Sequence, residues 1–207
     1  MAEQDAGLLP AEITALPQRI DFFEIKTCSD TRSYKKLVPA LKASPEHILV
    51  TADDDVNYPR DWLAILVNDY LRMPGIIAYR AHQPAIQQYD IAPYSSWKMN
   101  VRYTAGVLFP TGIGGVLYPP GCFLPEVTDE SLFMSLAPTA DDVWFFFCAR
   151  LNGWHARLAS QTFNIVNWRS THDSGLAKDN VQSGQNDVCI RNVVNHFGLD
   201  NVMAHLQ

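Results

Sequence analysis

Apolar and polar positions follow one another along the chain in patterns typical of strands and helices. Short apolar segments predict strands covered on both faces, and apolar residues at a helical spacing predict helices with one buried side. The expected strands are 20–25, 47–52, 76–82, 154–158 and 163–168, and the expected helices are 33–43, 61–72, 141–151 and 188–197. Strands that alternate with helices predict an α/β fold.

The remaining segments are expected to lack regular structure. Residues 103–121 are rich in proline and glycine, so we expect an irregular segment there, and such segments often carry functional residues. Residues 1–17 show no strong pattern and are expected to form an N-terminal tail. Residues 18–207 are then expected to form a single domain, as is usual for this length.

Composition argues against several classes of protein. Hydrophobic residues make up 47% of the chain and charged residues 18%, so the sequence can form a core and is not typical of a disordered protein. The net charge of −6 argues against binding to nucleic acid or to an anionic membrane. An acidic protein can still bind a phosphate group where a metal ion supplies the positive charge.

The cysteines and the apolar segments bear on the compartment. The four cysteines lie far apart in no zinc-binding pattern, so we expect free thiols in a reducing environment. Residues 1–12 lack the basic and apolar segments of a signal peptide, and prolines and glycines interrupt the most apolar region, 106–124. We therefore expect a cytoplasmic protein without a transmembrane segment.

Three consecutive aspartates, Asp53, Asp54 and Asp55, directly follow the apolar segment 47–52. In open α/β sheets, ligands bind beyond the carboxyl ends of the strands. Adjacent carboxylates repel one another unless a cation neutralises them, and Mg²⁺ and Mn²⁺ prefer such oxygen ligands. In an extended chain Asp53 and Asp55 lie on the same side and can act together. The alternative is a solvated acidic turn before the helix 61–72.

A second acidic pair, Asp141 and Asp142, begins the apolar helix 141–151. Carboxylates at this position interact favourably with the helix dipole, and a capping role alone would explain them. The alternative is that one of the two is a general base, because a carboxylate beside a cleft can accept a proton from an attacking hydroxyl group. The sequence leaves open which of the two would face the cleft.

Four segments occur in a fixed order: SYKKLVPAL, ILVTADDDVNYPRDWL, FPTGIGGVLYPPG and PTADDVWFFFCARLNGW. Together they resemble a bacterial family of glycosyltransferases with the GT-A fold, similar to enzymes that build capsular and cell-surface polysaccharides. The resemblance covers roughly residues 20–154. It implies a GT-A-like mixed sheet flanked by helices, a nucleotide-sugar donor, a glycan acceptor and a role in the synthesis of surface polysaccharide.

The resemblance also implies roles for the acidic residues. The segment TADDDV resembles the DxD element, in which Asp55 would hold Mn²⁺ or Mg²⁺. Asp53 would lie near the metal and the nucleotide ribose, and Asp54 would support either contact. The metal would bridge to the donor diphosphate and improve the leaving group. Asp142, or failing that Asp141, would deprotonate the acceptor hydroxyl group in a single displacement, which implies inversion.

The same resemblance assigns further residues. Gly114 and Gly115 would let the backbone approach the donor sugar, and Lys35 or Lys36 would pair with donor phosphate. The alternatives are a tight turn and a solvated helix face. His172 would supply a metal ligand from the C-terminal segment, unless it is a surface histidine. The residues expected to line the acceptor or a sugar face, if they are not in the core, are Arg80, His82, Trp97 and Trp144.

The N-terminus departs from the family pattern. The family members begin with an additional strand–helix–strand unit that contacts the nucleotide base, whereas the first matched strand here begins about twenty residues after Met1. We therefore expect weak donor binding, and either residues 1–17 folded over the exposed sheet edge or a homodimer formed there. Two rival hypotheses are a truncated, non-catalytic remnant that binds a glycan or a partner, and a metal-dependent phosphohydrolase.

Overall fold

The computed structural model describes residues 1–103, 106–166 and 184–206 of the chain. The strands are β1 (Leu49–Thr51), β2 (Ile76–Ala78), β3 (Ala81–His82), β4 (Ile86–Gln87), β5 (Asp90–Ile91), β6 (Phe109–Pro110), β7 (Val116–Tyr118) and β8 (Ala156–Leu158). The α-helices are α1 (Ala11–Thr14), α2 (Val38–Ala43), α3 (Trp62–Arg72), α4 (Glu130–Leu136), α5 (Asp141–Leu151), α7 (Gln185–Phe197) and α8 (Leu199–His205). The 3-10 helices are η1 (Glu3–Leu8), η2 (Leu16–Gln18), η3 (Arg32–Lys36), η4 (Tyr94–Ser96) and η5 (Pro125–Thr128).

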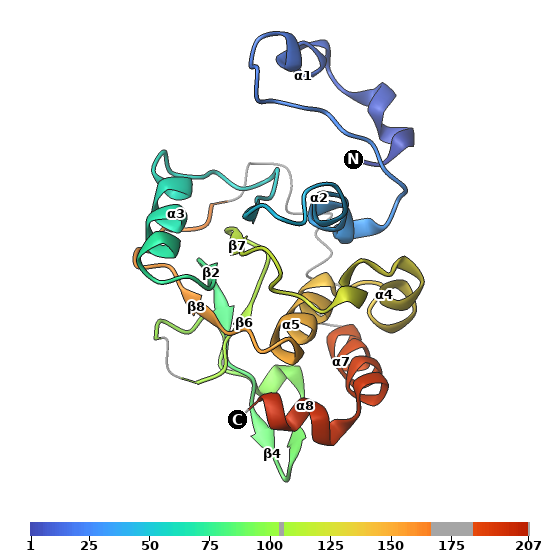
Figure 1. The fold of residues 1–207 in the computed structure, drawn as a ribbon, viewed down its shortest axis with the longest axis vertical. Helices are drawn as coiled ribbons and strands as arrows, with labels where there is room; N and C mark the ends of the chain where they lie inside the picture. Colours follow the sequence, from blue (N-terminus) through green and yellow to red (C-terminus); the bar gives the residue numbers. More distant parts are fainter. Residues whose placement is uncertain (104–105, 167–183, 207) are drawn as a thin grey trace.

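A mixed four-stranded sheet lies at the centre of the fold, with the strand order β1-β7-β2-β8. β7 pairs antiparallel with both β1 and β2, and β2 pairs parallel with β8. β3 and β6 form a separate antiparallel pair, and β4 and β5 form a short hairpin. The expected α/β fold, with a mixed sheet flanked by helices, is confirmed (Figure 1).

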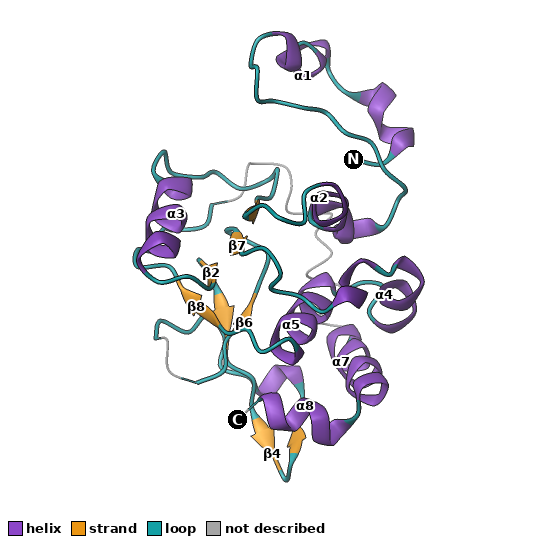
Figure 2. Cartoon of the chain, viewed as in Figure 1, coloured by secondary structure: helices purple, strands orange, loops and turns teal. Residues whose placement is uncertain are grey.

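Alternate residues of the central strands face opposite layers, as the pleat of a strand requires. Ile76 and Val116 belong to the large core cluster that contains the aromatic side chains of α5. Ile77 and Leu117 belong to a second cluster with Leu66 of α3. The sheet is therefore covered by α3 on one face and by α5 on the other (Figure 2).

The helix α5 is the centre of the hydrophobic core. It begins and ends where the sequence predicts, at Asp141 and Leu151, and Gly153 follows with a positive φ of 80°. Its side chains Trp144 and Phe147 are completely buried. α7 and α8 contribute buried apolar side chains to the same cluster. Because α5 is covered from several sides, its first turn is held rigidly relative to the sheet.

The short helix η3 is anchored to the segment before α5. The Tyr34 hydroxyl donates a hydrogen bond to the Ala137 carbonyl oxygen at 2.7 Å, and its ring stacks on Phe133 with centroids 4.0 Å apart. Both aromatic side chains are completely buried. This contact places Lys36, two residues after Tyr34, beside the first turn of α5.

Several sequence predictions were wrong in part. Residues 20–25 form no strand; the helix predicted at 33–43 is divided into η3 and α2, with Pro39 in the first turn of α2. Proline fits a first turn but not a helix interior, which explains the division. The segment 103–121, expected to be irregular, contains β6 and the central strand β7. Residues 163–166 form no strand, and the rest of that prediction lies outside the described residues.

One of the two expectations for the N-terminus was wrong: residues 1–17 do not fold over the edge of the sheet. Figure 1 shows η1, α1 and η2 extending away from the sheet. Their anchor is local: the Met1 ammonium donates to the Lys26 carbonyl oxygen at 3.0 Å, and the Cys28 N–H donates to the Met1 carbonyl oxygen at 3.0 Å. Phe22 within this segment is 92% exposed. The alternative expectation, a homodimer, stays a prediction.

Within the described residues, no helix is by itself long and apolar enough to cross a membrane. α4 and α5 reach the necessary length and composition only when taken together, and a bend of 115° separates them.

We predict that Gly115→Ala destabilises the protein by about 2–5 kcal/mol. Gly115 has a φ of +97°, and an added Cβ would lie 2.5 Å from the Trp62 ring and 3.0 Å from the Thr51 carbonyl oxygen. The matched control is Gly121→Ala, because Gly121 also has a positive φ but an open surrounding. It should cost only the backbone strain, about 1–2 kcal/mol. Urea unfolding measures both, and equal losses would contradict the packing role of Gly115.

Candidate functional site

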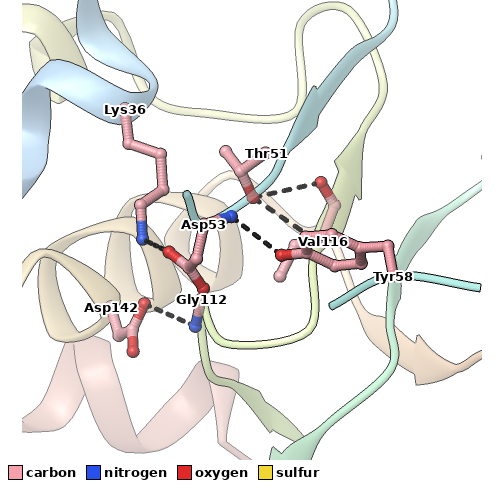
Figure 3. A network of polar contacts seen from close by, with 7 residues as sticks. All are labelled: Lys36, Thr51, Asp53, Tyr58, Gly112, Val116 and Asp142. Carbon is pink, nitrogen blue, oxygen red and sulfur yellow. Dashed lines mark hydrogen bonds and ion pairs between the residues drawn. The ribbon is translucent and has the colours of Figure 1, made fainter. Parts of the chain in front are cut away.

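The carboxyl end of β1 is fixed by hydrogen bonds of two side chains, Thr51 and Tyr58. The Thr51 hydroxyl oxygen accepts from the Val116 N–H at 3.3 Å and donates to the Val116 carbonyl oxygen at 3.4 Å, which ties β1 to β7. The Asp53 N–H then donates to the Tyr58 hydroxyl oxygen at 2.8 Å. In this turn the Asp53 carboxylate points to the Lys36 ammonium and forms an ion pair with it (Figure 3). A side chain from η3 thus meets the end of β1.

The pKa values of both Lys36 and Asp53 are raised. Burial by itself would lower the pKa of Lys36, but the carboxylates of Asp53 and Asp141 outweigh it and raise the pKa. Burial raises the pKa of Asp53 in spite of Lys36, and the neighbouring charges of Asp55 and Asp141 add to the effect. Several carboxylates therefore lie close to the partly exposed ammonium group of Lys36.

Asp142 lies across the glycine loop from this ion pair. Its Oδ1 accepts a hydrogen bond from the Gly112 N–H at 2.9 Å (Figure 3). A Cβ on Gly112 would lie 3.2 Å from that oxygen and 3.4 Å from the Lys36 Nζ, so Gly112 separates the two side chains at close range. Burial, followed by repulsion from Asp141, raises the pKa of Asp142 to about 7. A carboxylate with this pKa can accept a proton near neutral pH.

A cavity of about 190 Å³ opens beside the acidic pair. The residues that line it are Arg80, Tyr94, Phe109, Thr111, Ile113, Thr139, Ala140, Asp141, Asp142, Val143 and Asn186. The Arg80 Nε and the Thr111 Oγ1 are buried and make no hydrogen bond within the described part of the chain. Buried polar atoms of this kind are normally paired, so the residues around the cavity include two polar groups whose pairing is incomplete.

The remaining residues of the acidic cluster are placed differently from Asp53. Asp54 is exposed and Asp55 is half-buried in the same turn. Lys35 points away from the cluster and pairs with Asp30 at 2.5 Å. Of the two lysines, Lys36 is therefore the one that reaches the site.

The site contains carboxylate oxygens suited to Mg²⁺ or Mn²⁺, but the described residues include no group of three histidine, cysteine or acidic side chains that could hold a metal. The expected ligand His172 lies outside the described residues. Lys36 already pairs with Asp53, and Asp55 is the other half-buried carboxylate of the turn. The metal assignment stays a prediction.

The structure places the double glycine Gly114 and Gly115 inside the protein rather than on a donor surface. Trp62 Nε1 donates to the Gly114 carbonyl oxygen at 2.8 Å, and the Trp62 ring covers Gly115. A Cβ on Gly114 would lie 2.9 Å from the Ile165 side chain. Close packing against the protein's own side chains explains both glycines, whereas Gly112 is the glycine of this loop that faces the site.

Three of the expected sugar-lining residues belong to the core. His82 is 2% exposed, its Nδ1 accepts from the Asn100 N–H at 3.0 Å, and burial together with Arg80 lowers its pKa to about 4. The indole N–H of Trp97 donates to a backbone carbonyl oxygen at 2.9 Å, and that of Trp144 does so at 3.0 Å. Both tryptophans are almost completely buried. These three residues do not line a surface that a sugar could reach, whereas Arg80 does line the cavity.

Two residues of the site were missed by the sequence analysis. Tyr58 supports the turn because its hydroxyl oxygen accepts a hydrogen bond from the Asp53 N–H. Its position three residues after Asp55, in the segment DDDVNY, could have indicated that it belongs to the same turn. Thr111 lines the cavity, but a single threonine in a glycine-rich segment gives no sequence signal.

Comparisons with known proteins do not identify the chain: no family model matches it, and neither the curated proteins nor the solved structures give a significant match. The chemistry of the site is therefore argued from its geometry.

We predict a characteristic pH dependence of stability. Because the pKa of Asp142 is raised from 3.8 to about 7, the folded protein retains a proton between these values that the unfolded chain has released. This contribution makes stability fall as pH rises through that range, and the loss is complete above it. In Asp142→Asn the contribution disappears while the acceptor oxygen for Gly112 remains. The Tm of the variant relative to wild type should therefore increase by at least about 2 °C between pH 4 and pH 8.

The control is Asp141→Asn, which removes the neighbouring charge. It should lower the pKa of Asp142 and move the transition to lower pH without abolishing it. Tm is measured against pH by differential scanning calorimetry. If the Tm of Asp142→Asn differs from that of the wild type by the same amount at every pH, the pKa of Asp142 is not raised.

Proposed function

We propose that the protein is a metal-dependent glycosyltransferase of the GT-A type that transfers a sugar from a nucleotide-sugar donor to a glycan acceptor with inversion. The observation that carries the proposal is the position of Asp142: a carboxylate with a pKa near 7, beside a cavity of about 190 Å³ and close to the acidic end of β1. Resemblance of four sequence segments to surface-polysaccharide enzymes supports the same conclusion.

Asp142 serves as the general base in this proposal. The acceptor hydroxyl group enters the cavity and transfers its proton to Asp142 as it attacks the anomeric carbon of the donor. Asp141 acts through its charge, which helps to hold the pKa of Asp142 near the working pH. The Gly112 N–H fixes one carboxylate oxygen of Asp142, so the other oxygen is left for the acceptor.

The donor diphosphate is assigned to the end of β1. Asp55, with support from Asp53 and Asp54, would hold Mn²⁺ or Mg²⁺ there, and the metal supplies positive charge for the leaving diphosphate. Lys36 adds a permanent positive charge next to Asp53. This division of roles separates the base at α5 from the leaving-group site at β1, with Gly112 between them.

The structure also offers an argument for a second candidate, a non-catalytic domain that binds glycans. Lys36 already neutralises Asp53, so this part of the acidic cluster needs no metal to be stable. Such a domain would use the same cavity but would transfer no sugar. The two hypotheses differ in whether the protein turns over a nucleotide sugar.

We predict that Asp142→Asn lowers the rate of sugar transfer, or of donor hydrolysis, by about 10²–10⁴-fold. The substitution keeps the shape and the hydrogen bond to Gly112 and removes the ability to accept a proton. In the wild type the rate should increase with pH through about 7, the pKa of Asp142, and the residual rate of the variant should lack this dependence. Rates are measured with a panel of nucleotide sugars and Mn²⁺. A larger loss in Asp141→Asn would exchange the two roles, and no loss in either would exclude this base.

We predict that Asp55→Ala reduces Mn²⁺ affinity by at least tenfold, because it removes the half-buried carboxylate of the turn. Asp54→Ala is the matched comparison: Asp54 lies next to Asp55 but is exposed and is assigned only a supporting contact, so its loss should reduce the affinity less. Isothermal titration calorimetry with MnCl₂ and unchanged circular dichroism distinguish metal loss from unfolding. Equal Mn²⁺ affinity in the wild type and Asp55→Ala would refute the assignment.

A further inference from the structure

A second cavity, of about 410 Å³, shares Arg80 with the first but differs from it in its charge. The residues that line it are Tyr79, Arg80, Asn100, Val101, Arg102, Phe163, Asn164 and Ile165. Two of these residues are arginines, and none of the described residues that line the cavity carries a carboxylate. Arg80 also lines the cavity beside Asp142, so the two cavities share this residue.

The positive charge of Arg80 is incompletely compensated. Its Nε is buried and has no hydrogen-bond acceptor within the described residues. Burial lowers the pKa of Arg80 even though Tyr94 and Asp142 act in the opposite direction. Desolvating a cation is costly unless an anion or several acceptors balance it. Arg102, an exposed arginine, lines the same cavity, so two positive charges are available there to a negatively charged ligand.

The rest of the cavity wall suits a sugar ring. The rings of Tyr79 and Phe163 meet edge to face at 4.9 Å, and the Tyr79 hydroxyl is fixed by a hydrogen bond to the Trp62 carbonyl oxygen at 2.8 Å. Tyr79 is 5% exposed and belongs to the second core cluster, so the half-buried Phe163 is the aromatic side chain available to pack against the C–H face of a pyranose ring. The amides of Asn100 and Asn164 offer donors and acceptors for ring hydroxyl groups.

We propose that this second cavity binds an acidic sugar residue of the glycan acceptor, with the sugar carboxylate held between Arg80 and Arg102. Guanidinium groups bind planar carboxylates through paired charge-assisted hydrogen bonds. Because Arg80 is shared, a sugar bound here lies next to the sugar whose hydroxyl group reaches Asp142. The identification of the ligand as acceptor rests on the proposed function, whereas the binding of an acidic sugar does not.

The test uses the purified full chain and two probes that differ only in the anionic group, D-glucuronate and D-glucose. Binding is followed by ¹H–¹⁵N NMR titration up to tens of millimolar. We expect glucuronate to bind at least about tenfold more tightly than glucose and Arg102→Gln to remove this preference, since a tenfold change matches the loss of one charge-assisted contact. Arg102 is exposed, so the variant should fold. The matched control is Arg72→Gln, an exposed arginine that lines neither cavity and should leave the preference unchanged.

Other outcomes overturn the proposal. Equal binding of the two sugars, no binding of either, or an unchanged preference in Arg102→Gln would refute an acidic-sugar site. If inorganic phosphate binds as tightly as glucuronate and depends equally on Arg102, the cavity is a phosphate site instead. The Asp142→Asn variant keeps this test separate from the proposed function: it should bind glucuronate normally while losing transfer. A protein that binds glucuronate through Arg102 but transfers no sugar would refute the glycosyltransferase assignment alone.

Discussion

The ion pair between Lys36 and Asp53 determines how the site is built. It joins η3 to the end of β1, and it places the one cation of the cluster beside the first turn of α5. Without Lys36, the carboxylates of Asp53 and Asp141 would lose a cationic neighbour, and Asp142 would keep Arg80 as a nearby positive charge. A carboxylate cluster that loses a counter-charge either takes up protons or opens. Burial is the main cause of the raised pKa of Asp142, and repulsion from Asp141 adds to it because Lys36 offsets only part of the effect.

Part of the fold could be predicted because local signals and tertiary packing agree. In α5 the acidic first turn, the apolar interior and the glycine after the last turn all indicate the bounds that the structure has. β7 could not be predicted, because its three residues lie between Gly115 and Pro119 and are stabilised by two neighbouring strands rather than by their own sequence. The opposite error occurred at 20–25, where an apolar segment has no partner strand and leaves Phe22 exposed.

Site residues could be predicted where they depend on local sequence patterns and not where they depend on tertiary contacts. The positions of Asp53 and Asp142 follow from a strand end and a helix start, which sequence patterns locate well. The pairing of Lys36 instead of Lys35 depends on how Tyr34 anchors η3, which is a tertiary contact. Burial was the property that the sequence did not reveal: an aromatic side chain suited to stack on a sugar is equally suited to the core, and Trp144 is in the core.

The two cavities have complementary charges, and Arg80 lies between them. The first cavity contains Asp141 and Asp142, where a negative charge on a ligand would be repelled and would raise the pKa of Asp142 further. The second is lined by two arginines and, among the described residues, by no carboxylate, so a negative charge would be favoured there. A ligand with one neutral and one acidic sugar would therefore bind in a single orientation. Electrostatics would then select which end of the glycan presents its hydroxyl group to Asp142, a selection that neither cavity could make alone.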